Sequence, residues 1–273
     1  MKKRHERILV AGNGKSGTTA LYFRIKKSLP GEVSGFFEPA CFEEIEKYAM
    51  PDRHIISKIL LPVEGGFFER INSFFNKKIL IVRDPRDIIT SSLLYKGAYE
   101  LVWKKTPEQI SQCINLLKKK EADPSSLPVI KLLQHLHDDH DLKDYADWIA
   151  HRVSLTVQLA DNPSFFIFKY EDLIAERLNS LENYLEFPLT SDTSIDEEYS
   201  RVVRTKKSGS WKDWFLEEDI LFFKPLFAEC IAKLDYDPDW TPNADRKILP
   251  QHSSEYFRKL VNERRTQEGL PLI

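Results

Sequence analysis

The stretch Gly12-Asn13-Gly14-Lys15-Ser16-Gly17-Thr18-Thr19 decides the fold. It follows the apolar run Ile8-Leu9-Val10-Ala11, which predicts a short buried strand, and it precedes an amphipathic stretch from Ala20, which predicts a helix. Three glycines allow a tight turn in which backbone N–H groups and the helix N-terminus face one anion, while the lysine and the hydroxyls add donors. The order of strand, glycine-rich loop and helix therefore predicts a phosphate cradle.

The position of the lysine separates this loop from that of the ordinary nucleotide triphosphatases. Their lysine follows the last loop glycine directly, whereas here Thr18 occupies that place and Lys15 lies two residues before Gly17. This displacement argues against ATP hydrolysis. A glycine-rich turn that only joins a strand to a helix is the alternative, and the lysine and three hydroxyls in one loop weigh against it.

Further apolar runs alternate with helix-like stretches and predict the fold class. Short β-rich runs lie at 33–37, 54–61, 79–82 and 165–168, and helix-like stretches lie at 145–160, 178–187 and 217–234. This rhythm predicts an α/β fold of three layers, α/β/α, with a central parallel β-sheet of P-loop nucleotide-kinase type. We expect a single domain over 1–273, with a helical lid or insertion at about 96–144 and a basic tail at about 240–273.

Composition excludes several classes of protein. The chain has 273 residues, of which 42% are hydrophobic and 30% charged, as in soluble globular proteins rather than disordered or fibrous ones. A net charge of −2 and a pI of about 6.4 favour neither a nucleic-acid nor a membrane-surface partner. The three cysteines lie far apart, so we expect no disulfide framework and no zinc. No signal peptide or membrane-length apolar run is expected, which favours a cytoplasmic protein.

A second motif follows the run 79–82. Arg83 stands at the carboxyl end of this predicted strand, and Asp84 and Pro85 suit the N-cap and first position of a helix. Ligands of open α/β sheets bind beyond the carboxyl ends of the strands, so Arg83 and Ser91, eight residues later, suit one shared phosphate. A capped, salt-bridged helix start is the alternative interpretation of these residues.

Two later segments add candidate residues. The first is a basic loop that suits a second layer around a phosphate and contains Arg204, Lys206, Lys207, Gly209 and Trp211. A solvated basic loop is its alternative interpretation. The second is Tyr170-Glu171-Asp172 after the run 165–168, for which a core tyrosine with capping carboxylates is the alternative.

Together these motifs resemble those of the sulfotransferases that use 3′-phosphoadenosine-5′-phosphosulfate (PAPS). Lys15-Ser16-Gly17-Thr18-Thr19 is similar to the family's 5′-phosphosulfate loop, and the spacing of Arg83 and Ser91 is that of its 3′-phosphate motif. The late basic segment matches at Arg204, Gly209, Trp211 and Lys212. The resemblance spans Lys15 to about Leu234 and implies transfer of a sulfuryl group from PAPS to a hydroxyl or amine, with 3′-phosphoadenosine-5′-phosphate (PAP) as product and no metal.

The resemblance also implies the residues that bind the donor. They are Lys15, Ser16, Gly17, Thr18, Thr19, Arg83, Ser91, Tyr170, Arg204, Lys206, Lys207, Gly209 and Trp211. The family's tyrosine at the position of Tyr170 approaches the adenine.

Four positions depart from the family's pattern. Thr205 and Lys206 stand where the family has Lys and Gly, so Lys206 or Lys207 is expected to compensate with its side chain. Ala20 stands where many cytosolic members have a tryptophan, which leaves the stacking partner of the adenine open, with Trp211 as the candidate. Leu60 replaces the histidine base of those members.

The catalytic base must therefore be another residue. Carbohydrate-modifying members use a glutamate, and Glu38 follows the run 33–37 at the edge where the donor's sulfate is expected. A helix-start carboxylate before Pro39 is the alternative, and His54 is the rival base. Lys15 suits the charge on the leaving oxygen, and Lys58, a lysine in an apolar strand, suits a second contact to the sulfuryl group unless its tip reaches water.

The remaining histidines and the acceptor leave several interpretations open. Most of the histidines at 135, 137, 140 and 151 are expected to be solvated, because no carboxylate or cysteine pattern completes a metal site. The acceptor is expected to be a carbohydrate, glycolipid, lipid or small molecule. The rival functions are a P-loop kinase that uses magnesium and ATP, and a non-catalytic nucleotide-binding module.

Overall fold

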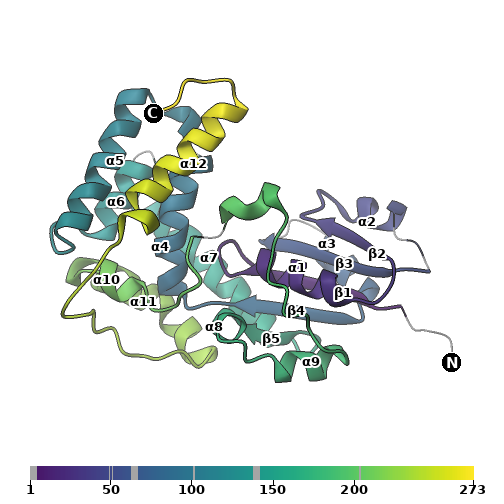
Figure 1. Ribbon diagram of the computed structural model, residues 1–273. Helices are drawn as coiled ribbons and strands as arrows, with labels where there is room; N and C mark the ends of the chain where they lie inside the picture. Colours follow the sequence, from purple (N-terminus) through teal and green to yellow (C-terminus); the bar gives the residue numbers. More distant parts are fainter. Residues whose placement is uncertain are drawn as a thin grey trace. The chain divides into compact units, whose positions relative to one another are not determined.

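The computed structural model describes residues 5–48, 50, 52–62, 67–100, 102–137, 142–202 and 204–273. The chain divides into two compact units, of which the first is Met1–Arg83 with Ser154–Ser200 and the second is Asp84–Val153 with Arg201–Ile273 (Figure 1). Each unit has its own secondary structure and its own buried core. The single-domain organisation stays a prediction.

The first unit contains a five-stranded parallel sheet. Its strands are β1 (Arg7–Asn13), β2 (Val33–Phe37), β3 (His54–Leu61), β4 (Lys77–Val82) and β5 (Phe166–Lys169), in the spatial order β2-β3-β1-β4-β5. All four strand pairs are parallel. The predicted parallel sheet is confirmed, and each predicted strand differs from the observed one by no more than two residues at an end.

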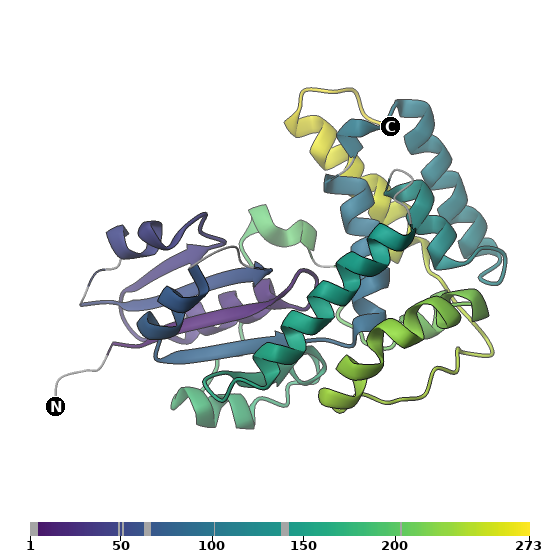
Figure 2. The ribbon, with the colours of Figure 1, turned by 180° about the vertical axis from the view of Figure 1, so that it is seen from behind.

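Helices cover both faces of this sheet. They are α1 (Thr18–Ser28), α2 (Phe42–Tyr48), α3 (Phe67–Phe74), α8 (Tyr170–Ile174), α9 (Asn179–Leu185) and the last part of α7 (Leu142–Ala160). Figures 1 and 2 show α1 and α9 on one face and α3 and α7 on the other. On the first face, sheet residues such as Val10, Ile56 and Ile81 pack with Leu21 of α1 and Leu181 of α9 in one apolar cluster. The predicted three-layer arrangement is confirmed.

The parallel sheet brings the candidate residues of the first unit to one edge. The carboxyl ends of parallel strands meet at the same edge of a sheet. Here β1 leads into the glycine-rich loop, β2 into Glu38, β4 into Arg83 and β5 into Tyr170. Because β1 lies between β3 and β4, the glycine-rich loop begins where the strand order changes direction, which is where α/β folds bind ligands.

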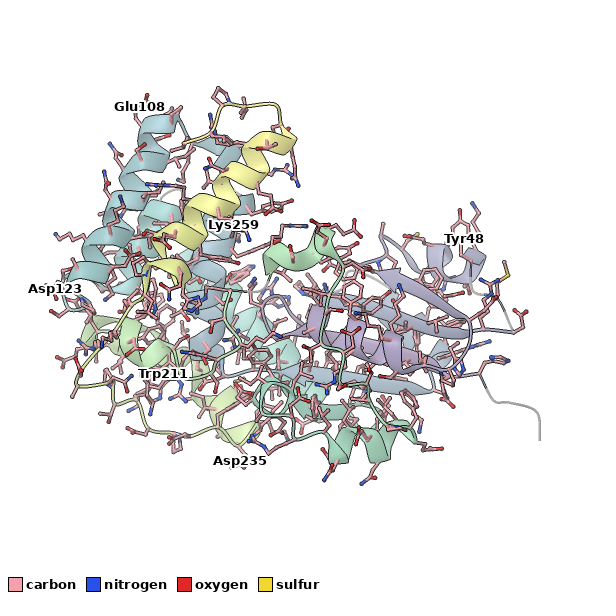
Figure 3. All side chains as sticks on the ribbon, viewed as in Figure 1. Tyr48, Glu108, Asp123, Trp211, Asp235 and Lys259 are labelled. Carbon is pink, nitrogen blue, oxygen red and sulfur yellow. The ribbon has the colours of Figure 1, made fainter. Side chains whose placement is uncertain are left out.

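The second unit is helical. It contains α4 (Pro85–Tyr95), the π-helix η1 (Lys96–Glu100), η2 (Val102–Lys104), α5 (Pro107–Ala122), α6 (Val129–Leu136), the first part of α7, α10 (Trp211–Trp214), α11 (Glu217–Lys233), η4 (Pro250–His252) and α12 (Ser254–Gln267), while η3 (Glu197–Val202) crosses the boundary of the units. Ile110, Ile114 and Leu117 form the buried side of α5, whereas Glu108 and Asp123 at its two ends are exposed (Figure 3).

One buried carboxylate ties two helix starts together in this unit. The side chain of Asp219 accepts hydrogen bonds from three backbone N–H groups, those of Val129 (2.9 Å), Ile130 (2.8 Å) and Leu216 (2.8 Å). These groups lie at the N-termini of α6 and α11, where helices leave donors unsatisfied. The fully buried ammonium of Lys120 donates to the carbonyl of Pro124, and burial lowers the pKa of Lys120 to about 8 although Asp219 partly opposes the shift.

Two expectations about the second unit need comment. The segment 240–273 is not a basic tail, because α12 buries Tyr256, Phe257, Leu260 and Val261. Their spacing is that of one helix face, a signal that the charged residues between them conceal. The described residues of 96–144 lie mostly in helices, from η1 to the start of α7, and the function of this segment as a lid stays a prediction.

Candidate functional site

The glycine-rich loop joins β1 to α1 through a turn closed by its own polar groups. Ser16 donates to the carbonyl of Asn13 from both its backbone N–H (3.2 Å) and its hydroxyl (2.7 Å). The Asn13 amide in turn donates to the Thr156 hydroxyl on α7 (2.8 Å). Gly17 is the N-cap of α1 with φ of 95°. The loop thus ends at a helix N-terminus, where backbone N–H groups favour an anion.

A tyrosine and an arginine support this loop from the ends of neighbouring strands. A Cβ atom on Gly17 would collide with the ring of Tyr170, which follows β5. The guanidinium of Arg83, which follows β4, lies 4.4 Å from the centroid of that ring. Arg83 also donates to the carbonyl of Lys15 (3.1 Å). The structure therefore brings Lys15, Gly17, Arg83 and Tyr170 together, and it packs the tyrosine ring against the loop. The approach of Tyr170 to adenine stays a prediction.

Glu38 and Lys58 form an ion pair at the end of β2. Phe37 pairs with Lys58 in the β2–β3 register, and the N–H of Glu38 donates to the carbonyl of Lys58 (2.9 Å). The Lys58 ammonium donates to the Glu38 carboxylate and lies 4.0 Å from the centroid of the Phe37 ring. Lys58 is 3% exposed and Glu38 is 42% exposed. Burial lowers the pKa of Lys58, and the Glu38 charge opposes that shift.

Lys15 and Glu38 both have a strained backbone conformation. Lys15 has φ of 69° and Glu38 has φ of 52°, in the left-handed region that costs about 1–2 kcal/mol for a residue with a Cβ atom. Among the described non-glycine residues the others with positive φ are Glu176, Glu186 and Asp235, which follow the ends of α8, α9 and α11. Left-handed residues are ordinary at helix ends. At strand ends, such strain is typical of functional sites.

His54 lies away from this group. It is the first residue of β3, and its Nδ1 accepts from the N–H of Glu6 (3.0 Å). Four residues of strand, about 13 Å, separate it from Lys58. The rival base therefore stands toward the amino end of the sheet, which argues for Glu38.

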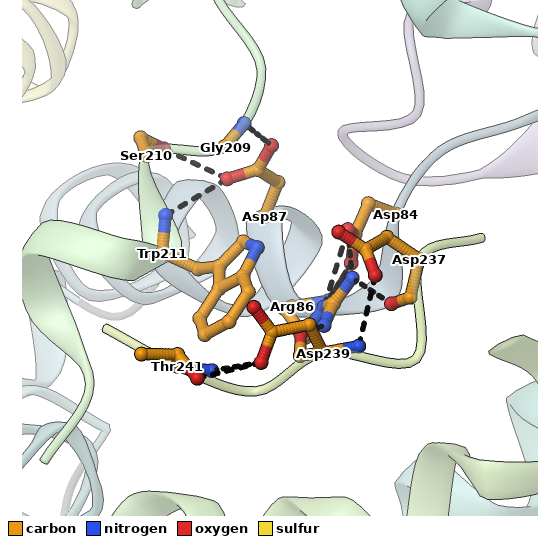
Figure 4. Close-up of polar contacts among 9 residues, drawn as sticks. All are labelled: Asp84, Arg86, Asp87, Gly209, Ser210, Trp211, Asp237, Asp239 and Thr241. Carbon is orange, nitrogen blue, oxygen red and sulfur yellow. Dashed lines mark hydrogen bonds and ion pairs between the residues drawn. The ribbon is translucent and has the colours of Figure 1, made fainter. Parts of the chain in front are cut away.

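In the second unit, residues at the start of α4 form a buried polar network. Asp84 caps the helix by accepting from the N–H of Arg86 (2.9 Å), as predicted, and pairs with its guanidinium (2.7 Å). That guanidinium also donates to the carbonyls of Asp237 (2.9 Å) and Asp239 (2.6 Å) (Figure 4). It lies 4.2 Å from the Trp211 ring centroid and 5.0 Å from that of Trp240. For Asp84 and Arg86, the interpretation as a salt-bridged helix start is right.

Asp87 binds the late basic segment. Its carboxylate accepts from the N–H of Gly209 (2.6 Å), the hydroxyl of Ser210 (2.9 Å) and the N–H of Trp211 (3.0 Å) (Figure 4). The N–H of Gly209 is therefore already engaged within the protein. Trp211 is 1% exposed and packs against Phe215 and Trp240, so its indole belongs to the core of this unit, and stacking on adenine stays a prediction.

The other predicted donor ligands of the second unit differ in exposure. Ser91 is buried on α4, one helical turn after Asp87. Arg204 is 9% exposed and donates to the carbonyl of His252 (3.1 Å) and the hydroxyl of Ser210 (3.2 Å). Lys206 and Lys207 are exposed.

The described histidines between 135 and 151 differ in exposure. His137 is buried and its Nε2 is 3.1 Å from the carbonyl of Leu93, so it is not one of the solvated histidines. His135 and His151 are exposed, and His140 lies outside the described residues. Among the described residues, no group of three or more His, Cys, Asp or Glu side chains could hold a metal ion.

Comparisons with known proteins bear on the fold. No protein-family model matches the chain, and no curated protein matches it. The chain is similar to the crystal structure of mouse sulfotransferase SULT7A1 complexed with PAP, with 18% sequence identity and a TM-score of 0.54 over 86% of this chain and 90% of that chain. It is also similar to the sulfotransferase domain from the curacin biosynthetic pathway, with 12% identity and a TM-score of 0.47 over 87% and 100% of the two chains. The first likeness shows that this chain has a sulfotransferase fold.

Sequence reasoning missed the residues that support the predicted ligands. The sequence predicts that Asp87 belongs to a helix start, and nothing in the sequence links it to Gly209, 122 residues later. Thr156 lies within an amphipathic helix and gives no signal of its contact with Asn13. The pairing of Lys58 with Glu38 had a signal, since a lysine in an apolar strand needs an anion.

Proposed function

We propose that this chain is a PAPS-dependent sulfotransferase that transfers a sulfuryl group to a hydroxyl or amine. The observation that carries the proposal is the arrangement at the carboxyl edge of the sheet. Lys15 in the anion-binding loop and Glu38 paired with Lys58 both follow strands, and the two residues adopt left-handed backbone conformations. A cation in a phosphate loop and a partly exposed carboxylate are the groups that sulfuryl transfer to a hydroxyl requires.

The proposed reaction is an in-line displacement at sulfur. The acceptor oxygen or nitrogen forms a bond to sulfur while the bond from sulfur to the bridging oxygen of PAPS breaks, and PAP leaves. Glu38 takes the proton of the acceptor, and Lys15 stabilises the charge that develops on the bridging oxygen. The ion pair with Lys58 holds the Glu38 carboxylate in place, and its ammonium is also the proposed second contact to the sulfuryl group.

The proposed donor ligands follow from the motifs of the sequence. In the first unit the proposed 5′-phosphosulfate ligands are the loop residues Lys15, Ser16, Gly17, Thr18 and Thr19. Arg83 is a proposed ligand of the 3′-phosphate, and Tyr170 is the proposed contact to the adenine. In the second unit the proposed ligands are Ser91, Arg204, Lys206 and Lys207, with Gly209 and Trp211 shaping the segment. The family resemblance of these motifs supports this assignment. No metal is part of the proposed reaction.

The acceptor and the setting are proposed more broadly. Phe37 directly precedes Glu38 in the chain, and its ring centroid lies 4.0 Å from that of Tyr199. This aromatic surface favours a carbohydrate, glycolipid, lipid or phenol as acceptor. Among the described helices none is long and apolar enough to span a membrane. A cytoplasmic enzyme stays our proposal.

Calorimetric titration of the whole chain with PAP tests the donor site. Matched titrations use 5′-AMP, which lacks the 3′-phosphate, and ATP with magnesium. We expect tight binding of PAP that needs its 3′-phosphate. Preference for ATP with magnesium would contradict the proposal and indicate a kinase. Binding of PAP without transfer of labelled sulfuryl from PAPS to a wide panel of hydroxyl and amine acceptors would indicate a non-catalytic module.

Three substitutions divide the proposed functions of the residues. Lys15→Ala should reduce turnover more than PAP affinity, whereas Arg83→Ala should chiefly weaken PAP binding. Glu38→Gln should keep PAP affinity and reduce the rate at least ~100-fold, the usual scale for a positioned base. Glu32→Gln is the matched control, because this exposed carboxylate pairs with Arg53 before β2 begins. Near-normal turnover of Glu38→Gln would remove Glu38 from the reaction.

A further inference from the structure

The carboxylate of Asp87 is the centre of a buried contact between α4 and the late basic segment. It is fully buried, and its two oxygens accept from Gly209, Ser210 and Trp211. One carboxylate on the first turn of α4 thus holds three consecutive residues at the start of α10 (Figure 4). Hydrogen bonds to a charged acceptor contribute about twice as much as those between neutral groups. The conformation of this segment therefore depends on Asp87.

The Ser210 hydroxyl carries this constraint to Arg204. The hydroxyl donates to Asp87 and accepts from a terminal nitrogen of Arg204 at 3.2 Å. Because the hydroxyl proton points to the carboxylate, its lone pairs are left for the guanidinium. The other terminal nitrogen of Arg204 donates to the carbonyl of His252 at 3.1 Å. Two fixed acceptors therefore hold a nearly buried cation whose direction is set partly through Asp87.

Asp87 lies on α4 near Ser91, another proposed donor ligand. Ser91 lies four residues later, so the two side chains share one face of the helix. Arg86 also contacts this segment, because its guanidinium lies 4.2 Å from the centroid of the Trp211 ring. Loss of the Asp87 charge should therefore loosen the segment near Gly209 without unfolding the unit.

We propose that Asp87 is a positioning residue for donor binding, which acts through Gly209 and Ser210 to orient Arg204 toward the 3′-phosphate. The inference rests on the proposed function, because it takes Arg204 as a ligand of that phosphate. Asp87 itself does not bind the donor, since a buried carboxylate would repel a phosphate and its oxygens already accept three hydrogen bonds.

The test compares PAP with 5′-AMP on matched variants, because only the first ligand carries the 3′-phosphate. Calorimetry on Ser210→Ala should show PAP affinity lowered about tenfold, the scale of one hydrogen bond to a charged group, with 5′-AMP affinity unchanged. Ser210→Thr, which keeps the hydroxyl, should restore PAP affinity. Asp87→Asn should lower PAP affinity by at least as much, again without an effect on 5′-AMP.

Each outcome bears on the inference. Variants that keep the wild-type preference for PAP would overturn it, and so would equal weakening of both ligands, since that pattern indicates a structural role alone. If Asp87→Asn does not fold, the comparison of Ser210→Ala with Ser210→Thr decides. A wild-type chain that binds PAP and 5′-AMP equally would overturn the proposed function and this inference with it, whereas failure in the variants alone leaves the proposed function intact.

Discussion

Gly17→Ala should destabilise the protein strongly, and the structure gives the size of the effect. Gly17 has φ of 95°, which costs about 1–2 kcal/mol once a Cβ atom is present. The new methyl group would also collide with the ring of Tyr170, and overpacking of this kind costs about 1–3 kcal/mol. The ring cannot retreat freely because the Arg83 guanidinium lies on it. We therefore expect a loss of about 2–5 kcal/mol in the free energy of unfolding.

Urea denaturation of a set of variants separates the two causes. Gly14→Ala is the matched control, since a Cβ atom at Gly14 meets nothing within 4 Å and its φ is not positive. Tyr170→Ala removes the ring, so in the double variant with Gly17→Ala only the backbone cost should remain. The coupling between the two substitutions should be about 1–3 kcal/mol, the cost of the collision. Equal stability of Gly17→Ala and Gly14→Ala would refute the reasoning.

Three further predictions concern groups that support the fold and the loop. Burial lowers the pKa of Lys120 to about 8, below its value in the unfolded chain. Between these two pKa values the unfolded chain binds more protons than the folded one, so the free energy of unfolding should rise with pH, by about 1–2 kcal/mol from pH 8 to 9.5. Thermal or urea unfolding checks this, and Lys120→Met should remove the rise; an unchanged slope in that variant would assign the rise to other groups. Asp219→Ala leaves three helix-start N–H groups without their acceptor and should cost about 2–4 kcal/mol in urea unfolding, with Asp219→Asn milder because it keeps one oxygen. Thr156→Val keeps the shape but removes the acceptor of the Asn13 amide, so hydrogen exchange in the loop 13–19 should become faster while global stability falls by only about 1 kcal/mol; unchanged exchange would contradict the contact.

The sequence by itself determined the sheet and the two motif loops. The strands of a parallel sheet are buried on both faces, so they appear as short continuous apolar runs, and each run lies within two residues of an observed strand. Asp84 and Pro85 mark the start of α4 by local chemistry that needs no distant partner. The glycine-rich loop is equally local, because its turn and its helix N-terminus lie within eight residues.

Tertiary structure alone decided which side chains meet. The ion pair of Lys58 and Glu38 depends on the register of β2 on β3, which pattern does not specify when both faces of a strand are apolar. Asp87 meets Gly209 only because the fold returns the chain to α4 after 122 residues. The sequence analysis took Trp211 for a ligand-facing residue, and its burial depends likewise on Trp240, far along the chain. The burial of His137 depends on its contact with Leu93. Local propensity acts over a few residues, whereas the cost of leaving a buried charge or polar group unpaired is settled by whatever the fold places beside it.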